Sequence, residues 1–195
     1  MHPIACRCGQ LKGRVDDPRG LARATCYCRD CATFVRYLGC DDQLDEAGGT
    51  ELAHTNPGYV QFTEGRSNLA CLRLSPRGAM RWYAKCCGTP IANTHHDPRF
   101  YFTTLISPCL VDDRADMDRL FGARRALVNT GGARSGFTLK ERGKLRFLFR
   151  VGTSVIQARL TGGYRQTPFF DTALNPVCDV RVLTREERRA ARPPE

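Results

Sequence analysis

Short runs of alternating or continuous apolar residues predict a β-rich region over the first 110 residues. Residues 4–8 and 12–15 flank a turn at Gly9. Residues 29–38 instead place apolar side chains at helical spacing, which predicts a short helix. Further strand-like runs lie at 24–28, 59–63, 69–74, 79–83 and 100–106.

Helical periodicity replaces this alternation after residue 110. Residues 113–121 predict a short helix, and a glycine-rich loop follows it at 131–136. Residues 141–160 predict one amphipathic helix, which ends at Gly162. Its expected solvent face carries Arg142, Arg146 and Arg150. Its expected core face consists of Leu145, Leu148, Phe149, Gly152, Val155, Ile156 and Leu160.

These elements predict a mainly β protein with appended helices, of the α+β class. We expect a β-rich domain over 1–110 and a helical C-terminal extension over 111–195 that packs on it. Near the end, Thr184 and Glu187 have the spacing of a capping box, which predicts a last, exposed helix.

Composition places the chain among ordered globular proteins, with 42% hydrophobic and 26% charged residues. No segment approaches the roughly 18 continuous apolar residues of a membrane helix. Residues 1–9 do not have the pattern of a secretory signal. We therefore expect a cytoplasmic protein without a membrane partner, in which thiols stay reduced.

The net charge of +10 comes mostly from arginines, which are spread from Arg7 to Arg192. A nucleic-acid footprint is usually clustered on one element, so this spread does not favour a nucleic-acid partner. If seven cysteine thiolates held two zinc ions, the net charge would fall by three.

Seven of the eleven cysteines fall into three clusters. The sulfurs around a tetrahedral zinc ion lie about 3.8 Å apart, and alternate residues of an extended segment share a face, so these clusters predict a zinc centre. Four isolated cysteines are expected to pack as small apolar residues. The clusters are Cys6 and Cys8, then Cys26, Cys28 and Cys31, and finally Cys86 and Cys87.

The middle cluster supplies three thiolates from six residues, and its fourth coordination position must come from elsewhere. Structural zinc sites are closed, whereas catalytic sites keep one position open. Three thiolates also make zinc a weak Lewis acid that suits a soft fourth ligand, such as a substrate thiolate.

The ordered motifs CxCG, CxCxxC and CGTP resemble those of the glutathione-dependent formaldehyde-activating enzyme family, to which centromere protein V also belongs. The resemblance covers about residues 4–106. The Trp82-Tyr83 pair before the double cysteine is similar to an uncharacterised bacterial branch of that family.

This resemblance implies an Mss4-like β-tent zinc fold with two metal sites. It assigns Cys6, Cys8 and Cys87 to a structural zinc ion. It assigns Cys26, Cys28 and Cys31 to a catalytic zinc ion that meets a glutathione adduct.

The chain departs from the family pattern at its third cluster, where Ala84 replaces a cysteine and Cys86 is gained. Cys86 either turns in beside Cys87 and completes the structural site, or it points away and closes the site of the trio. We favour the first slightly, because a new cysteine beside a lost ligand suggests a compensating exchange.

The first functional hypothesis is therefore a carbon-sulfur lyase that acts on a glutathione-aldehyde adduct, with Arg29 or Arg36 attracting the carboxylates of glutathione. The alternative is a zinc-stabilised binding protein without catalysis, and a nucleic-acid-binding protein is less favoured. The sequence does not determine the oligomeric state.

Overall fold

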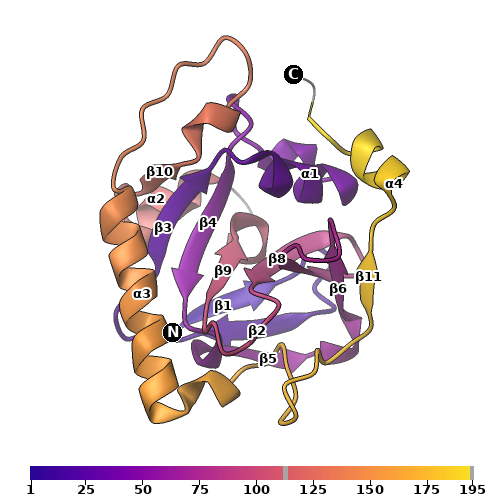
Figure 1. Ribbon diagram of the computed structural model, residues 1–195, viewed down its shortest axis with the longest axis vertical. Coiled ribbons are helices and arrows are strands. Elements are labelled where there is room, and N and C mark those ends of the chain that lie inside the picture. Colours follow the sequence, from indigo (N-terminus) through magenta and orange to yellow (C-terminus); the bar gives the residue numbers. More distant parts are fainter. Residues whose placement is uncertain (112–113, 194–195) are drawn as a thin grey trace.

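The computed structural model describes residues 1–111 and 114–193 and has an α+β architecture with two β-sheets (Figure 1). The small sheet has the order β1-β2-β5, formed by β1 (His2–Ala5), β2 (Lys12–Val15) and β5 (Val60–Glu64). The large sheet has the order β10-β3-β4-β9-β8-β7-β6-β11. Its strands are β3 (Ala22–Cys26), β4 (Thr50–Thr55), β6 (Leu69–Arg73), β7 (Met80–Ala84), β8 (Thr89–Thr94), β9 (Thr103–Ile106), β10 (Ala126–Val128) and β11 (Val180–Val182).

The predicted α+β class is confirmed, while the finer Mss4-like arrangement stays a prediction. Two central strands, β4 and β8, were not predicted, because both are fully buried yet rich in polar residues. In β4, Glu51 pairs with Arg23, and His54 Nδ1 donates to the Thr103 carbonyl oxygen at 2.9 Å. These partners let polar side chains occupy positions that a hydrophobicity pattern assigns to loops.

The C-terminal segment, described over residues 114–193, contributes strands to both edges of the large sheet. β10 pairs in parallel with β3 at one edge, and β11 pairs in parallel with β6 at the other. The predicted extension over 111–195 therefore contains two strands in addition to its helices. The division of the chain at residue 110 stays a prediction.

The described residues form four α-helices, of which α1 and α4 lie near each other and α3 runs along the β3 edge (Figure 1). The capping box is confirmed, since the Thr184 hydroxyl accepts from the Glu187 amide and the Glu187 carboxylate accepts from the Thr184 amide. The helices are α1 (Arg29–Tyr37), α2 (Arg114–Phe121), α3 (Lys144–Thr161) and α4 (Arg185–Ala190). Residue 113, the expected start of α2, lies outside the described residues.

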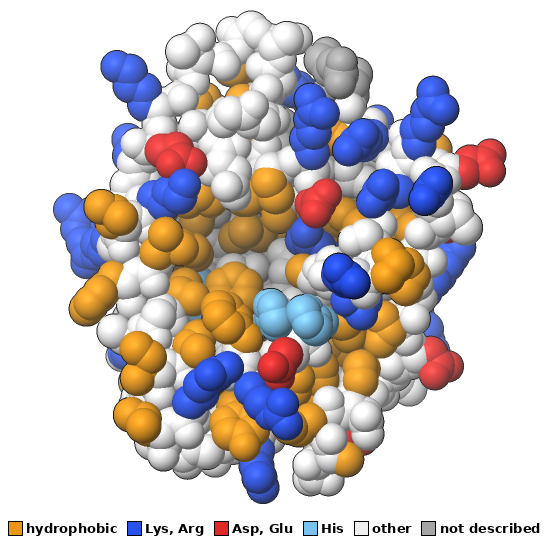
Figure 2. Space-filling model, viewed as in Figure 1, with side chains coloured by type: hydrophobic (Ala, Val, Ile, Leu, Met, Phe, Trp, Pro, Cys, Tyr) orange, Lys and Arg blue, Asp and Glu red, His pale blue; other side chains and the backbone are white. Residues whose placement is uncertain are grey.

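The expected core face of α3 is confirmed at Val155 and is otherwise wrong. Leu145, Phe149 and Leu160 are 84%, 74% and 83% exposed, and apolar side chains gather on the surface along this edge (Figure 2). The buried stripe consists of Val151, Ser154, Val155 and Ala158. The Ser154 hydroxyl donates to the Arg150 carbonyl oxygen at 2.9 Å within the helix, so burying this polar residue leaves its hydroxyl paired.

The core joins both sheets to the C-terminal segment. Trp82 on β7 is fully buried, and its ring centroid lies 5.0 Å from that of Phe169 and 5.9 Å from that of Phe170. Its indole N–H donates to the Thr94 hydroxyl at 2.9 Å. Within the described part of the chain, no helix is both long and apolar enough to cross a membrane.

Candidate metal centres

Four cysteine sulfurs from two distant stretches of chain meet at one point. The Sγ atoms of Cys6, Cys8, Cys86 and Cys87 all lie within 4.8 Å of one another. The Cys6–Cys8 distance is 3.5 Å, the Cys6–Cys86 distance 3.8 Å and the Cys8–Cys86 distance 3.4 Å. These separations are close to the value of about 3.8 Å for sulfurs around a tetrahedral zinc ion. We call these four residues the four-cysteine cluster.

Two tight turns bring these sulfurs together. Gly9 adopts φ 73° and its amide donates to the Cys6 carbonyl oxygen, so the chain reverses directly after Cys8. Cys86 and Cys87 lie in the turn between β7 and β8, where the Cys87 and Gly88 amides both donate to the Ala84 carbonyl oxygen. Because Cys86 and Cys87 occupy a turn rather than a strand, both of their sulfurs face Cys6 and Cys8. Cys86 thus belongs to the first of the two arrangements considered above.

The Cys87 sulfur is held by Thr89. The Thr89 hydroxyl accepts from the Arg7 amide at 3.0 Å, and its oxygen lies 3.0 Å from Cys87 Sγ, so the hydroxyl can donate to a Cys87 thiolate. Burial opposes ionisation of Cys87, but this hydrogen bond and neighbouring backbone amides prevail and lower the pKa of its thiol to about 6. The cluster therefore favours a thiolate at this position.

The second cluster contains Cys26, Cys28 and Cys31, and we call it the trio. Its three Sγ atoms lie within 4.8 Å of one another, and no fourth metal-binding side chain joins them among the described residues. Cys26 ends β3, Cys28 caps the N-terminus of α1 and Cys31 lies in its first turn. Cys26 and Cys31 are buried, whereas Cys28 is partly exposed, so the trio opens to solvent on the Cys28 side.

Arg81 on β7 supplies a buried positive charge to the trio. Its Nη1 donates to Cys31 Sγ at 3.5 Å and to Asn93 Oδ1 at 2.9 Å. No carboxylate lies within 4.0 Å of Arg81 in the part of the chain that the structure describes. A buried cation needs a counter-charge, and here the cysteine sulfurs are positioned to provide it.

Contacts with the Cys26 and Cys28 thiols, assisted by Arg81, lower the pKa of Cys31 against the opposing effect of burial. A thiolate at Cys31 is the protonation state that a metal ion requires.

Asn129 in the C-terminal segment is a further neighbour of the trio that sequence reasoning missed. It adopts φ 55°, and its Nδ2 donates to Cys26 Sγ at 3.2 Å. The next residues form the predicted glycine-rich loop, in which a Cβ on Gly132 would collide with the Tyr27 carbonyl oxygen. The glycines at 131 and 132 were the signal for this close approach, although they did not indicate what the loop approaches.

Arg29 and Arg36 are at opposite ends of α1. Arg29 begins the helix next to the trio and is exposed. Arg36 lies in the last turn, where its Nη1 is 2.6 Å from Asp41 and its Nε donates to the Ala191 carbonyl oxygen. The structure thus brings only Arg29 near the trio, and a role in binding a substrate stays a prediction for both.

The remaining cysteines lie outside both clusters. Cys71 and Cys109 are buried in the core, where burial raises the pKa of each thiol to about 12. They therefore behave as apolar packing residues, as predicted. The described residues thus contain two cysteine clusters whose geometry suits metal binding, one with four sulfurs and one with three.

Comparison with solved structures finds a Rhodobacter sphaeroides protein known from a crystal structure. It is 18% identical, with a TM-score of 0.43, and the match covers 65% of this chain and 99% of that one. No curated protein matches. A family model described as "Family of unknown function (DUF6151)" matches residues 1–179. The chain therefore belongs to the DUF6151 family.

Proposed function

We propose that this protein binds two zinc ions, a structural one in the four-cysteine cluster and a second one in the trio with a position open to a thiolate ligand. The observation that carries the proposal is the placement of Cys86, whose sulfur lies 3.8 Å from Cys6 and 3.4 Å from Cys8. Because Cys86 completes the four-cysteine cluster, the trio keeps three sulfurs.

Charge supports a metal ion in the trio. Three thiolates around one divalent ion have a net charge of −1, which Arg81 neutralises across its contact with Cys31. Without a metal ion, the thiolate favoured at Cys31 would balance Arg81, but the other two clustered thiols would stay mostly protonated; a divalent ion would hold all three as thiolates. Thiolates select soft ions such as zinc, which has no redox chemistry of its own.

The chemistry that we propose for the trio is reversible addition of a thiol to an aldehyde. Zinc would supply a binding position that favours a thiolate over water. The sulfur attacks the carbonyl carbon, one carbon-sulfur bond forms, and a proton from solvent neutralises the resulting alkoxide; the reverse step breaks that bond and releases both partners. The resemblance of the CxCG, CxCxxC and CGTP motifs to glutathione-dependent formaldehyde-activating enzymes supports glutathione as the thiol.

Two residues of this chain would hold the sulfurs of the trio in place. Asn129 donates to Cys26 and Arg81 donates to Cys31. Both contacts lower the electron density on a thiolate, so they stabilise the ligands and keep the site receptive to one more anionic sulfur. The partly exposed Cys28 marks the side from which the thiol would enter.

The zinc content of single cysteine variants distinguishes the two proposed sites. We expect two zinc ions per chain under reducing conditions, one after Cys86→Ser and one after Cys28→Ser. Cys178→Ser is the matched control, because Cys178 lies outside both clusters and should keep two. Atomic spectroscopy of the dialysed proteins measures the content. Loss of the same ion in both variants, or a metal-free wild-type protein that folds, contradicts the proposal.

X-ray absorption tests the open position. The two zinc ions should average 3.5 sulfur ligands and should rise toward four when glutathione is added, only if Cys28 is intact. Turnover of glutathione with formaldehyde should vanish in Cys28→Ser and persist in Cys178→Ser. An average of four sulfurs before glutathione is added would indicate two closed sites and a zinc-stabilised protein without catalysis.

A further inference from the structure

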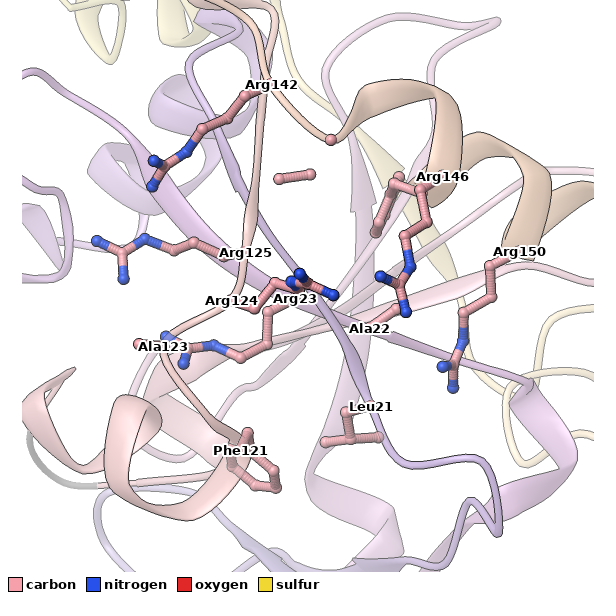
Figure 3. A pocket seen from close by; sticks show the side chains of 13 residues that line it. Leu21, Ala22, Arg23, Phe121, Ala123, Arg124, Arg125, Arg142, Arg146 and Arg150 are labelled. Atoms are coloured by element: carbon pink, nitrogen blue, oxygen red, sulfur yellow. The ribbon is translucent and has the colours of Figure 1, made fainter.

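A groove of about 820 Å³ lies beside α3, at the edge of the large sheet formed by β10 and β3 (Figure 3). Its walls come from the start of β3, the segment after α2 and the first turns of α3. This volume is within the usual range for small-molecule sites. The lining residues are Leu21, Ala22, Arg23, Phe121, Ala123, Arg124, Arg125, Ala126, Arg142, Gly143, Arg146, Phe147 and Arg150.

Among the described residues, six arginines and no acidic residue line this groove. Three of the six have carboxylate partners outside the lining. Arg23 and Arg125 share Asp118, with Arg23 also paired to Glu51. The third, Arg150, has Nη2 3.7 Å from Asp17. These ion pairs hold the guanidinium groups of Arg23, Arg125 and Arg150 in place.

The other three arginines, Arg124, Arg142 and Arg146, are exposed and have no carboxylate within 4.0 Å among residues 1–111 and 114–193. Arg124 and Arg146 stand on opposite walls with their guanidinium groups turned toward the space between them (Figure 3). Burial, together with the charges of neighbouring arginines, holds the pKa of Arg150 below its ordinary value despite Asp17. The groove therefore concentrates positive charge that the fold itself does not neutralise.

We propose that this groove binds a small organic phosphate that carries at least two negative charges. Guanidinium groups match phosphate oxygens through paired N–H donors, and the two unpaired groups that face each other, those of Arg124 and Arg146, exceed the need of a single monocarboxylate. Leu21, Phe121 and Phe147 add apolar surface suited to an organic moiety. A walled groove of this volume fits a small molecule better than an extended nucleic-acid backbone. This inference does not depend on metal in either cysteine cluster.

Inorganic pyrophosphate is a suitable probe, measured by calorimetry on the full chain at constant ionic strength. We expect saturable binding at one site. Arg124→Gln and Arg146→Gln should each weaken binding about tenfold, because each removes a charged donor pair. Both side chains are exposed and unpaired, so the variants should fold, which circular dichroism checks. Arg77→Gln removes the same charge from an exposed position outside the groove and should leave binding unchanged.

Four results would overturn the proposal. The first is the absence of saturable pyrophosphate binding, and the second is an equal weakening by Arg77→Gln, which would indicate a response to net charge. The third is tighter binding of a 20-nucleotide DNA that pyrophosphate does not displace, which would assign the arginines to a nucleic acid. Equal binding of acetate at the same ionic strength would also contradict a multiply charged ligand.

Discussion

Buried polar side chains in the large sheet each depend on a specific partner. His54 on β4 is an example, since its Nδ1 donates to the Thr103 carbonyl oxygen while Nε2 is buried without a partner. Its ring stacks on Phe102 and meets Phe147 of α3 edge to face. Protonation would place an unpaired N–H and a positive charge in this apolar contact.

Stability should therefore fall in mild acid because of His54. Burial, only partly opposed by the Thr103 hydrogen bond, lowers its pKa from 6.5 to about 4. Since the unfolded chain binds the proton first, the stability that neutral His54 provides is present above pH 6.5 and is lost as pH falls toward 4. The expected loss between pH 7.5 and pH 5 is about 2 kcal/mol.

Urea unfolding of wild type and His54→Asn at several pH values measures this effect. Asparagine keeps a donor for Thr103 but does not titrate, so the variant should lack this part of the pH dependence. Metal ligands also bind protons in acid, and they do so equally in both proteins. Parallel pH profiles for the two proteins would show that His54 is not responsible.

At the scale of elements, the ends of helices carry much of the specific chemistry. The N-terminus of α1 is capped by Cys28, whose sulfur accepts from the Cys31 amide at 3.4 Å, so one residue both begins the helix and belongs to the trio. The N-terminus of α4 is closed by Thr184 and Glu187, and the carbonyl of Ala191 after its last residue accepts from Arg36 of α1.

Loss of this capping box should loosen α4. Thr184→Ala removes the acceptor for the Glu187 amide and is expected to cost about 1 kcal/mol. Hydrogen exchange should therefore speed up at Glu187, and the free energy of unfolding in urea should fall. Thr184→Ser keeps the hydroxyl and serves as the matched control. An unchanged exchange rate in the alanine variant would mean that other contacts hold the end of α4.

At the scale of the whole molecule, the C-terminal segment is part of the core. It provides strands at both edges of the large sheet, Asn129 beside the trio and Phe169 against Trp82. Most of the helical residues also belong to it, since α2, α3 and α4 all follow residue 110. The fluorescence of the single tryptophan therefore reports on the core, and circular dichroism at 222 nm mainly on this segment.

We expect the two signals to change together during denaturant unfolding, because the segment and the rest of the core share buried contacts. Phe169→Ala should lower both midpoints together, with a loss of about 3–5 kcal/mol. Phe149→Ala is the matched control, since that ring is 74% exposed and should matter little. Separate midpoints in the wild-type protein would show that residues 111–195 unfold independently.

The sequence alone determined the features that rest on local spacing. The CxCG, CxCxxC and double-cysteine motifs marked the sulfurs that meet, because short segments with glycine turns have few ways to present neighbouring thiols. The capping box, the helix after Cys28 and the strands β1, β2, β3, β5, β6, β7 and β9 were predicted for the same reason.

Tertiary structure alone decided what depends on contacts between distant segments. β4 and β8 are strands because polar residues such as Glu51 and His54 find buried partners, and a hydrophobicity pattern does not show this. The buried face of α3 was likewise decided by packing against the β3 edge, and so were the arrival of Asn129 and Arg81 at the trio and the gathering of six arginines in one groove. Burial and pairing are properties of neighbours in space, and only the folded chain places those neighbours together.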